Sequence, residues 1–586
     1  MAHGLGIIGN CSYSALLDRG SVEWLCWPRP DSSFVFGPLL DRERGGVNVV
    51  EGLGADDVSQ EYVENTNVLK TTFRGPSGSF ELLDFAPRFA LYDRHFKPLM
   101  LVRILRRLDG EPRVRLRCRP VYDYGATETR SWHGSNHIQY TDLPAPVRLT
   151  TNVPLAYVEE ERPFLVERDH HIVLTWGEPL ETGLEETAER FLERTIDYWR
   201  RWVKGTRTPR DYQREVIRSA LVLKLHQYED TGALLAATTT SLPEHPGSGR
   251  TWDYRYCWLR DAYFTLNALE RLGSNDEMER FLVYLRNLAE ERAGELQPVY
   301  TISGSASAPE WEVPHLAGYR GEQPVRVGNQ AFEHVQNDVY GEMILAVSRL
   351  FLDARFAGDI APRTALGLVG KLLEQIERRL EEPDAGPWEL RGTRKLHGFS
   401  LLAHWAGAQR AVEVAHALDD AALAARANAL MEQAGRILDE RFWDEEVGAL
   451  TQAAGEKHLD AVMLLAVQLG FLEAGDPRAE RHVHTIQRTL RINGDLLKRY
   501  SAPDDFGRPV AAFTVCSFWL TEALALLGRS EEGRGLFDHL LTLHNGLGLY
   551  SEDILPETKE QSGNFPQTYS HVGLINAAFR LSRRWE

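Results

Sequence analysis

The period of the hydrophobic residues changes near residue 180, and this change constrains the fold of the 586-residue chain more than any other feature. Before the change, in EPRVRLRCRP, Val114, Leu116 and Cys118 alternate with arginines, which is the period-two pattern of a half-buried strand. Similar short runs, separated by Gly, Pro and Asp turn signals, are NVLKTTFRG, SFELLDFAP, LMLVRIL and HIVLTWG. The pattern predicts an antiparallel β-sandwich over residues 1–180.

Helical spacing replaces this pattern from Glu181. The segment ETGLEETAERFLERTIDYWRRWVKG has few breakers, so residues 181–205 are predicted to form a linker helix. Over residues 206–586 the apolar runs are longer, and many carry apolar residues on more than one face, as helices do when they pack against several neighbours. No fixed repeat of the kind that a solenoid shows is visible. The chain is therefore predicted to end in a layered helical barrel of about a dozen helices.

The charge of the chain limits its partners. A net charge of −18 repels phosphate backbones and anionic lipid surfaces, and no run of Lys and Arg occurs. No apolar run approaches the length of a membrane span, and the first thirty residues lack the basic and apolar regions of a signal peptide. We therefore expect a cytoplasmic protein that binds neither nucleic acid nor membrane and acts on a neutral small molecule.

Three common kinds of site find no support in the sequence. The N-terminal GLGIIG matches a dinucleotide motif on paper, but no strand fits before it. HExxH and GxSxG motifs are absent, so neither a metal nor a serine nucleophile is expected. The five cysteines are scattered without CxxC spacing, and we expect them to be reduced and buried.

The stretch RTWDYRYCWLRDAYF, residues 250–264, mixes six aromatic with five charged residues. Sugars present apolar CH faces that pack on aromatic rings, and hydroxyl groups that charged side chains bind. A sugar pocket would use both kinds of residue. The alternative, which the stretch alone leaves equally open, is that Trp258, Tyr263 and Phe264 belong to the core while Arg260 and Asp261 form a structural ion pair.

Two glutamates lie in loops of the kind that carry active-site residues. Glu389 follows Trp388 in PDAGPWELRG, and an acid partly shielded from water by an indole suits a proton donor. Taken alone, it could also be a surface glutamate beside a packed tryptophan. Glu552 lies in a second loop, rich in glycine, aromatic residues and amides. Two such carboxylates meeting across a barrel mouth would supply the pair that hydrolysis of a glycoside requires.

Four separated motifs resemble glycoside hydrolase family fifteen, which contains glucoamylases, glucodextranases and prokaryotic trehalases. They are GNCSYSALLDRGSVEWLCWPRPDSSFVFGPLLD, TWDYRYCWLRDAYFTLNAL, GPWELRG and LYSEDILPETKEQSGNFPQTYSHVGLINAAF. The resemblance implies an N-terminal β-sandwich, a linker and an (α/α)6 barrel. It also implies an inverting hydrolase without metal or organic cofactor, in which Glu389 is the general acid and Glu552 the general base.

The resemblance further implies which residues bind the sugar. Trp258, Arg260 and Asp261 would hold the non-reducing glucosyl unit in the innermost subsite. Further walls of the pocket would come from Trp388, Arg391, Arg320 and Gln336.

The choice of substrate is less constrained than the chemistry. The motifs look most like the trehalase branch, and without a visible signal peptide or starch-binding module an intracellular disaccharide is expected, so α,α-trehalose is the predicted substrate. A glucoamylase or α-glucosidase acting on maltooligosaccharides or isomaltose-type links is the main alternative. A glycoside phosphorylase and a non-catalytic sugar-binding regulator are more remote. Three departures from the family pattern, Pro387, Leu401 and Asp553, bear on substrate choice, and the sequence leaves a homo-oligomer open.

Overall fold

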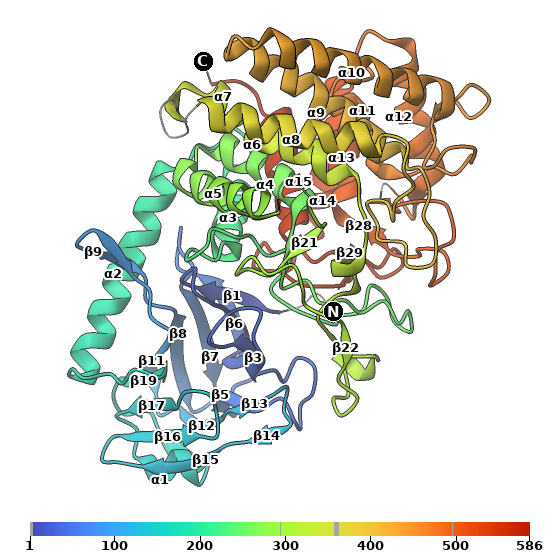
Figure 1. Ribbon diagram of the computed structural model, residues 1–586. Helices are drawn as coiled ribbons and strands as arrows, with labels where there is room; N and C mark the ends of the chain where they lie inside the picture. Colours follow the sequence, from blue (N-terminus) through green and yellow to red (C-terminus); the bar gives the residue numbers. More distant parts are fainter. Residues whose placement is uncertain (1–3, 293–294, 357–361, 495, 586) are drawn as a thin grey trace.

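The computed structural model describes residues 4–292, 295–356, 362–494 and 496–585. A β-domain and a helical barrel lie one above the other, and the long helix α2 (Leu184–Gly205) runs along the side of the β-domain toward the barrel (Figure 1). The three parts follow one another along the chain in the predicted order.

Two antiparallel sheets form the β-domain. The first contains, in spatial order, β1 (Gly6–Gly9), β2 (Ser14–Asp18), β3 (Ser21–Cys26), β5 (Val47–Leu53), β12 (Arg113–Arg119) and β18 (Phe164–Leu165), with β4 (Phe34–Phe36) pairing with β3. The second contains β15 (Arg130–His133), β16 (His137–Thr141), β17 (Val147–Thr151), β19 (His170–Trp176), β11 (Met100–Gly110), β8 (Gly78–Phe85), β7 (Leu69–Gly75) and β6 (Asp57–Tyr62). Apolar residues of both sheets meet in one core. The predicted sandwich is therefore confirmed.

The strands differ in how many of their faces are covered. In β12 the apolar residues Val114, Leu116 and Cys118 are buried and the arginines between them are not, as the alternating pattern predicts. By contrast, the first six residues of β11, Met100–Leu105, are all buried. Leu192 of α2 packs with Val102 and Ile104 on the outer face of this sheet, so β11 lies between the sandwich core and the helix. A strand covered on both faces needs a nearly continuous apolar run.

Twelve helical segments form two concentric rings in the described part of the barrel. The inner ring contains α4 (Leu259–Leu272), α6 (Asp338–Val347), α9 (Gly398–Ala417), η4 with α11 (Ala461–Leu464, Leu465–Gln468), α13 (Thr514–Leu526) and α15 (Thr568–Leu581). Each contacts the next, and α15 returns to α4, which closes the ring. The outer ring contains α3 (Gln213–His226), α5 (Asn275–Glu291), α8 (Pro362–Arg379), α10 (Ala421–Arg441), α12 (Pro477–Leu490) and α14 (Ser530–Leu541). Inner and outer helices alternate along the chain.

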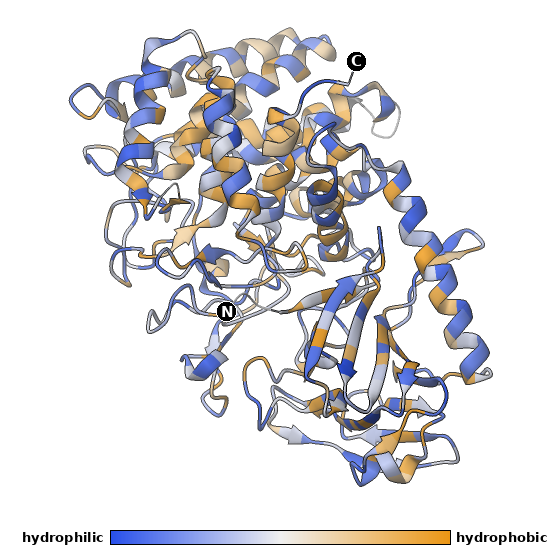
Figure 2. Ribbon diagram, turned by 180° about the vertical axis from the view of Figure 1, so that it is seen from behind, coloured by the Kyte–Doolittle hydropathy of each residue, from blue (hydrophilic) through white to orange (hydrophobic). Residues whose placement is uncertain are grey.

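The position of each helix follows from its sequence. Inner helices such as α13 are buried along nearly all of their length, and outer helices such as α12 bury one stripe and expose the rest. Figure 2 shows the hydrophobic residues gathered inside the barrel. Glycines let two inner helices approach closely, because a Cβ on Gly407 of α9 would lie 2.6 Å from Cα of Gly341 in α6. The layered barrel inferred from many-sided apolar helices is confirmed.

Shorter elements connect these parts. They are α1 (Leu155–Glu159), α7 (Arg349–Leu352), η1 (Tyr319–Gly321), η2 (Gln330–Glu333), η3 (Ala354–Phe356), and the paired strands β9 (Phe89–Leu91) with β10 (Arg94–Phe96), β13 (Val121–Tyr122) with β14 (Thr127–Glu128), β20 (Cys257–Trp258) with β21 (Val299–Tyr300), β22 (Trp311–Glu312) with β23 (Arg326–Val327), β24 (Trp443–Asp444) with β25 (Ala449–Leu450), β26 (Arg491–Ile492) with β27 (Leu496–Leu497), and β28 (Ala512–Phe513) with β29 (Asp553–Ile554) and β30 (Gln561–Ser562).

The β-domain supports the loops at the near end of the barrel. Trp24 donates from Nε1 to the carbonyl of Thr238, at 3.0 Å. The fully buried Arg255 donates to the carbonyl of Ser32 at 2.6 Å and to the Tyr124 hydroxyl at 3.1 Å. The same guanidinium pairs with Asp253 at 2.7 Å. Arg255 is therefore held by the β-domain on one side and by its own segment of the barrel domain on the other.

We propose residues 1–180, 181–205 and 206–586 as the limits of the β-domain, linker and barrel.

None of the helices in the described part of the chain combines the length and the apolar character that crossing a bilayer requires. All five cysteines, Cys11, Cys26, Cys118, Cys257 and Cys516, are free and buried.

Candidate active site

The segments that precede five of the inner helices, α4, α6, α9, α13 and α15, contribute residues to the lining of one cavity. The residues before their first turns include Trp258 for α4, Phe513 for α13 and Gln567 for α15, and all three line the cavity. The loops that precede the inner helices therefore carry the residues that can meet a ligand. Helix N-termini also favour negative charge, which suits the acidic residues found there.

The space between the lining side chains, counted together with the part open to solvent, is about 800 Å³. The aromatic lining residues are Trp252, Tyr254, Trp258, Trp388, Phe506, Phe513 and Tyr569. The charged lining residues are Glu244, Arg250, Arg260, Asp261, Glu389, Arg391, Arg499, Asp504 and Asp505. Interleaved rings and ions in a concave site are what a sugar, with its CH faces and hydroxyl groups, would require.

Glu389 lies on the cavity wall in a left-handed backbone conformation, with φ of 60°. Its Oε1 accepts from Nε1 of Trp258 at 2.6 Å and from Nη2 of Arg260 at 3.3 Å. The carboxylate keeps some solvent access, with 20% of the side chain exposed. The preceding Trp388 is held from behind, since its Nε1 donates to Oδ2 of Asp460 at 2.7 Å. The loop thus presents Glu389 to the cavity at a defined position.

Asp261 occupies the first turn of α4 beside Arg260, with 3.8 Å between Oδ1 and Nε. Burial raises the pKa of Asp261 to about 7, against the opposing effect of Arg260. Trp258, Arg260 and Asp261 therefore lie together at the start of one inner helix, as the sequence predicted them to, and all three line the cavity.

Glu552 lies one hydrogen bond behind the cavity wall. It is fully buried, and its Oε1 accepts from the hydroxyl of Tyr254, a lining residue, at 2.6 Å. The rings of Tyr254 and Trp258 are in edge contact, with centroids 5.5 Å apart. Two adjoining aromatic side chains therefore each hold one of the two glutamates.

The surroundings of Glu552 are more acidic than those of Glu389. One carboxylate oxygen from each of Glu244, Glu552 and Asp553 lies within 4.8 Å of the others. Burial and, second, Glu244 raise the pKa of Glu552, while Arg499 and the Tyr254 hydrogen bond act in the opposite direction. Three carboxylates at this spacing could hold a cation. The protein itself already supplies positive charge there, because Arg499 pairs with Glu244.

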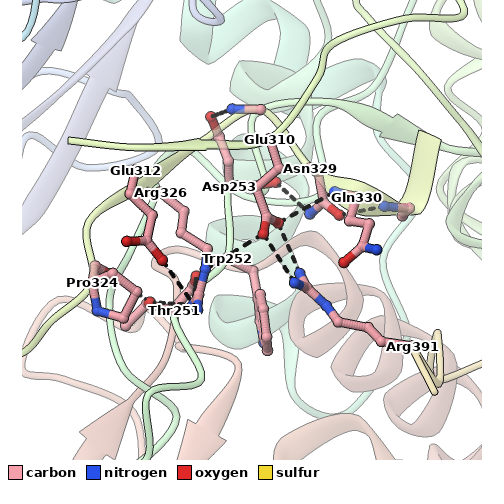
Figure 3. A network of polar contacts seen from close by, with 12 residues as sticks. Thr251, Trp252, Asp253, Glu310, Glu312, Pro324, Arg326, Asn329, Gln330 and Arg391 are labelled. Atoms are coloured by element: carbon pink, nitrogen blue, oxygen red, sulfur yellow. Dashed lines mark hydrogen bonds and ion pairs between the residues drawn. The ribbon is translucent and has the colours of Figure 1, made fainter. Parts of the chain in front are cut away.

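Arg391 belongs to an ion-pair clamp at the mouth of the cavity. Figure 3 shows its guanidinium facing Glu310, with Nη1 and Nη2 at 2.9 and 2.7 Å from the two carboxylate oxygens. Arg326 approaches the same carboxylate at 3.5 Å, and both guanidinium groups lie over the ring of Trp252. Because Arg391 binds both oxygens of Glu310 and lies over the ring of Trp252, it holds these two residues in place as well as facing the cavity.

A second loop reaches the same mouth. Oδ2 of Asp505 accepts from the backbone amides of Arg391 and Gly392 at 2.6 and 3.0 Å. The ring of Phe506 meets Trp252 edge-on, with centroids 5.2 Å apart. Loops that are distant in sequence are thus tied together where a ligand would enter.

Two residues expected in the pocket lie outside its lining. Arg320 has a half-exposed side chain that faces Glu560 at 4.0 Å. Gln336 is buried and donates from Nε2 to the carbonyl of Gly386 at 2.5 Å, so it supports the loop that carries Glu389 from behind. The likeness of a loop in sequence did not specify where its side chains point.

The lining residues that were not singled out in the sequence include Glu244, Tyr254, Arg499 and Trp252. Tyr254 and Trp252 belong to the aromatic stretch 250–264, so its composition was a signal for them. Within that stretch both interpretations hold for different residues, because Trp258 and Arg260 line the cavity whereas Phe264 packs into the barrel core. For Glu244 and Arg499 no local signal exists.

Comparison with known proteins identifies the class. A bacterial glucoamylase solved in complex with acarbose superposes with a TM-score of 0.72 at 15% sequence identity, covering 99% of this chain and 94% of that one. The chain therefore has the glucoamylase-like fold, with an N-terminal β-domain and an (α/α)6 barrel. Residues 210–579 match the model of glycosyl hydrolases family 15, and residues 3–154 match the trehalase-like N-terminal domain.

The chain belongs to glycosyl hydrolase family 15 and is a glycoside hydrolase. Among its curated relatives, the trehalase of Mycolicibacterium smegmatis is 33% identical, covering 99% of this chain and 91% of that protein. The trehalase of Mycobacterium tuberculosis is 32% identical over 97% and 87%, and that of Thermoplasma volcanium 30% identical over 98% and 93%. The family inferred from four motifs is confirmed.

Proposed function

We propose that this enzyme hydrolyses α,α-trehalose to two molecules of glucose by a single displacement. Glu389 donates a proton to the glycosidic oxygen as the bond to the anomeric carbon breaks. Glu552 takes a proton from the water that attacks the opposite face of that carbon. The reaction consumes one water and inverts the configuration of the attacked centre.

One observation carries this proposal more than any other: Tyr254 and Trp258, in contact with each other, hold Glu552 and Glu389 at one cavity. In this proposal Glu389, with a partly exposed carboxylate, protonates the glycosidic oxygen. Glu552, hydrogen-bonded to the Tyr254 hydroxyl, takes a proton from a water bound beside that hydroxyl. An inverting mechanism requires about 6.5–9.5 Å between such carboxyl groups, to leave room for the water.

The choice of trehalose is supported by the relatives. Six curated relatives that match along nearly the whole chain carry the name trehalase. The expected location is the cytoplasm, and five buried, unpaired cysteines are compatible with a reducing compartment.

Proton NMR of the first products tests the proposal. The purified enzyme is incubated with trehalose and, separately, with maltotriose and isomaltose. An inverting trehalase produces one β-glucose, from the attacked unit, and one α-glucose, from the leaving unit, per trehalose before mutarotation. If only the maltose- or isomaltose-type substrate reacted, the enzyme would be a glucoamylase or α-glucosidase with the same chemistry. Two α-glucose molecules from trehalose would contradict the single displacement.

A further inference from the structure

The side chains around Glu552 form a charged network that reaches beyond its direct contact with Tyr254. Glu244 is almost fully buried and ion-pairs through Oε2 with the buried Arg499. Its other oxygen accepts from Nε1 of Trp252 at 3.1 Å. Glu244 is thereby fixed between an arginine and an indole, with its charge beside Glu552.

Arg499 is held in the same place by several contacts. Its guanidinium lies 5.3 Å from the ring centroid of Phe513 and 5.9 Å from that of Trp388. These rings exclude water from the pair, and charges interact more strongly when water is excluded. A buried negative and a buried positive charge therefore both act on Glu552 at short range.

We propose that Glu244 and Arg499 are positioning residues for the hydrolytic reaction: Glu244 makes Glu552 a stronger base, and Arg499, held by Glu244, keeps Glu552 from becoming permanently protonated. This inference rests on the proposed role of Glu552. It assigns a role in the reaction to two residues that lie 255 positions apart in the sequence.

The other groups facing Glu552 do not account for this effect. Tyr254 donates a hydrogen bond to it, and the backbone amide of Asn564 approaches Oε2 at 3.4 Å. Asp553 is buried beside it, and burial raises the pKa of Asp553 well above its ordinary value. Arg250 approaches Glu244 at 3.8 Å but pairs with Asp504. Glu244 and Arg499 are thus the two charged side chains that act on the pKa of Glu552 in opposite directions.

The direction in which Glu244 and Arg499 each shift the pKa of Glu552 can be measured. A negative neighbour raises the pKa of a carboxyl group, and a positive neighbour lowers it. The acid limb of the kcat/KM profile reports the pKa of the essential base in the free enzyme. Glu244→Gln keeps the acceptor for Trp252 and removes the charge, so the acid limb should move to lower pH by about one unit. Arg499→Gln should move it to higher pH.

The experiment measures kcat/KM for trehalose from acid to alkaline pH in both variants, with the melting temperature as a check on folding. Arg499→Lys, which keeps the charge, serves as the second variant in case Arg499→Gln fails to fold, and its acid limb should stay near that of the parent. Glu310→Gln is the matched control, because it removes a carboxylate from the clamp at the mouth, away from Glu552, and should leave the acid limb in place.

Opposite shifts in the two charge-removing variants support the inference. Lower activity with an unmoved acid limb in Glu244→Gln would overturn it and leave Glu244 a structural residue. Failure of the proposed function looks different: in that case Glu552→Gln itself would retain trehalose hydrolysis, whatever the pH profile of the Glu244 variant.

Discussion

Glu389 and Glu552 are held at one cavity by neighbouring aromatic donors, yet their surroundings differ in access and in charge. Glu389 stands in a loop, partly exposed, between the Trp258 indole and the Arg260 guanidinium. Glu552 is fully buried among two other carboxyl groups, with one arginine to balance them. Two residues of the same type are thus given different properties by their neighbours. Glu389 faces hydrogen-bond donors and solvent, whereas Glu552 faces two other carboxyl groups.

The largest expected effect comes from removing either glutamate. Glu389→Gln and Glu552→Gln should each lower kcat for trehalose by about 10²–10⁴-fold, the usual contribution of a general acid or base. α-D-Glucosyl fluoride separates the two, because fluoride leaves with little help from a proton donor. Glu389→Gln should therefore recover much of its rate with the fluoride, whereas Glu552→Gln should not. Equal recovery in both variants would remove the distinction between the two sites.

Gly563 offers a way to disturb the buried Glu552 and its neighbour Asp553 without touching Glu389. A Cβ at this position would lie 2.7 Å from Oε2 of Glu552, and the residue has φ of 75°. Gly563→Ala should cost about 1–2 kcal/mol in the free energy of unfolding for the backbone. It should also lower kcat by about 10²-fold, because it displaces the base. Gly455→Ala is the control: its φ is 77° with open space around it, so it should lose stability without losing activity.

Trp258→Phe tests the exposed glutamate in the same way. The variant keeps an aromatic ring but loses the 2.6 Å hydrogen bond to Glu389. A hydrogen bond to a charged group contributes about 1.5–3 kcal/mol, so kcat/KM should fall about 10–100-fold. Trp443→Phe removes a similar bond to Glu445, an exposed residue outside the cavity lining, and should leave kinetics unchanged. A loss of less than threefold in Trp258→Phe would show that Arg260 alone positions the carboxylate.

The smallest effect is expected at Arg320. Because its side chain is half exposed and lies outside the cavity lining, Arg320→Ala should change kcat/KM for trehalose by less than about twofold. Arg391→Ala, which breaks the clamp on Glu310, should raise KM several-fold in the same assay. A large effect in Arg320→Ala would mean that its loop moves to the cavity when substrate binds.

Patterns local in sequence predicted the fold well. Alternating residues in β12 and many-sided apolar helices such as α13 follow directly from burial on one or on several sides. Trp258, Arg260 and Asp261, which were expected to bind the innermost sugar unit, do lie together at one cavity, because they are close in sequence at the start of one helix.

Prediction from the sequence failed for side chains whose neighbours come together only when the chain folds. Glu244 and Arg499 meet only because two loops converge at the barrel end, and neither lies in a distinctive local pattern. Gln336 was expected in the pocket wall, but its side chain turns to the Gly386 carbonyl, a backbone group that needs a partner once buried. Side-chain direction in irregular loops depends on such partners, which sequence spacing does not reveal.

The contacts of Arg255 have a consequence for how such proteins can be recombined. This residue, three positions from Trp258, is bound by Ser32 and Tyr124, which belong to the β-domain. A chimaera that joins the barrel of one relative to the β-domain of another would leave this buried guanidinium with Asp253 but without its two β-domain acceptors, unless those were transferred with it. The barrel and the β-domain should therefore be exchanged between relatives together. For the same reason, we expect the two domains to have evolved as one unit.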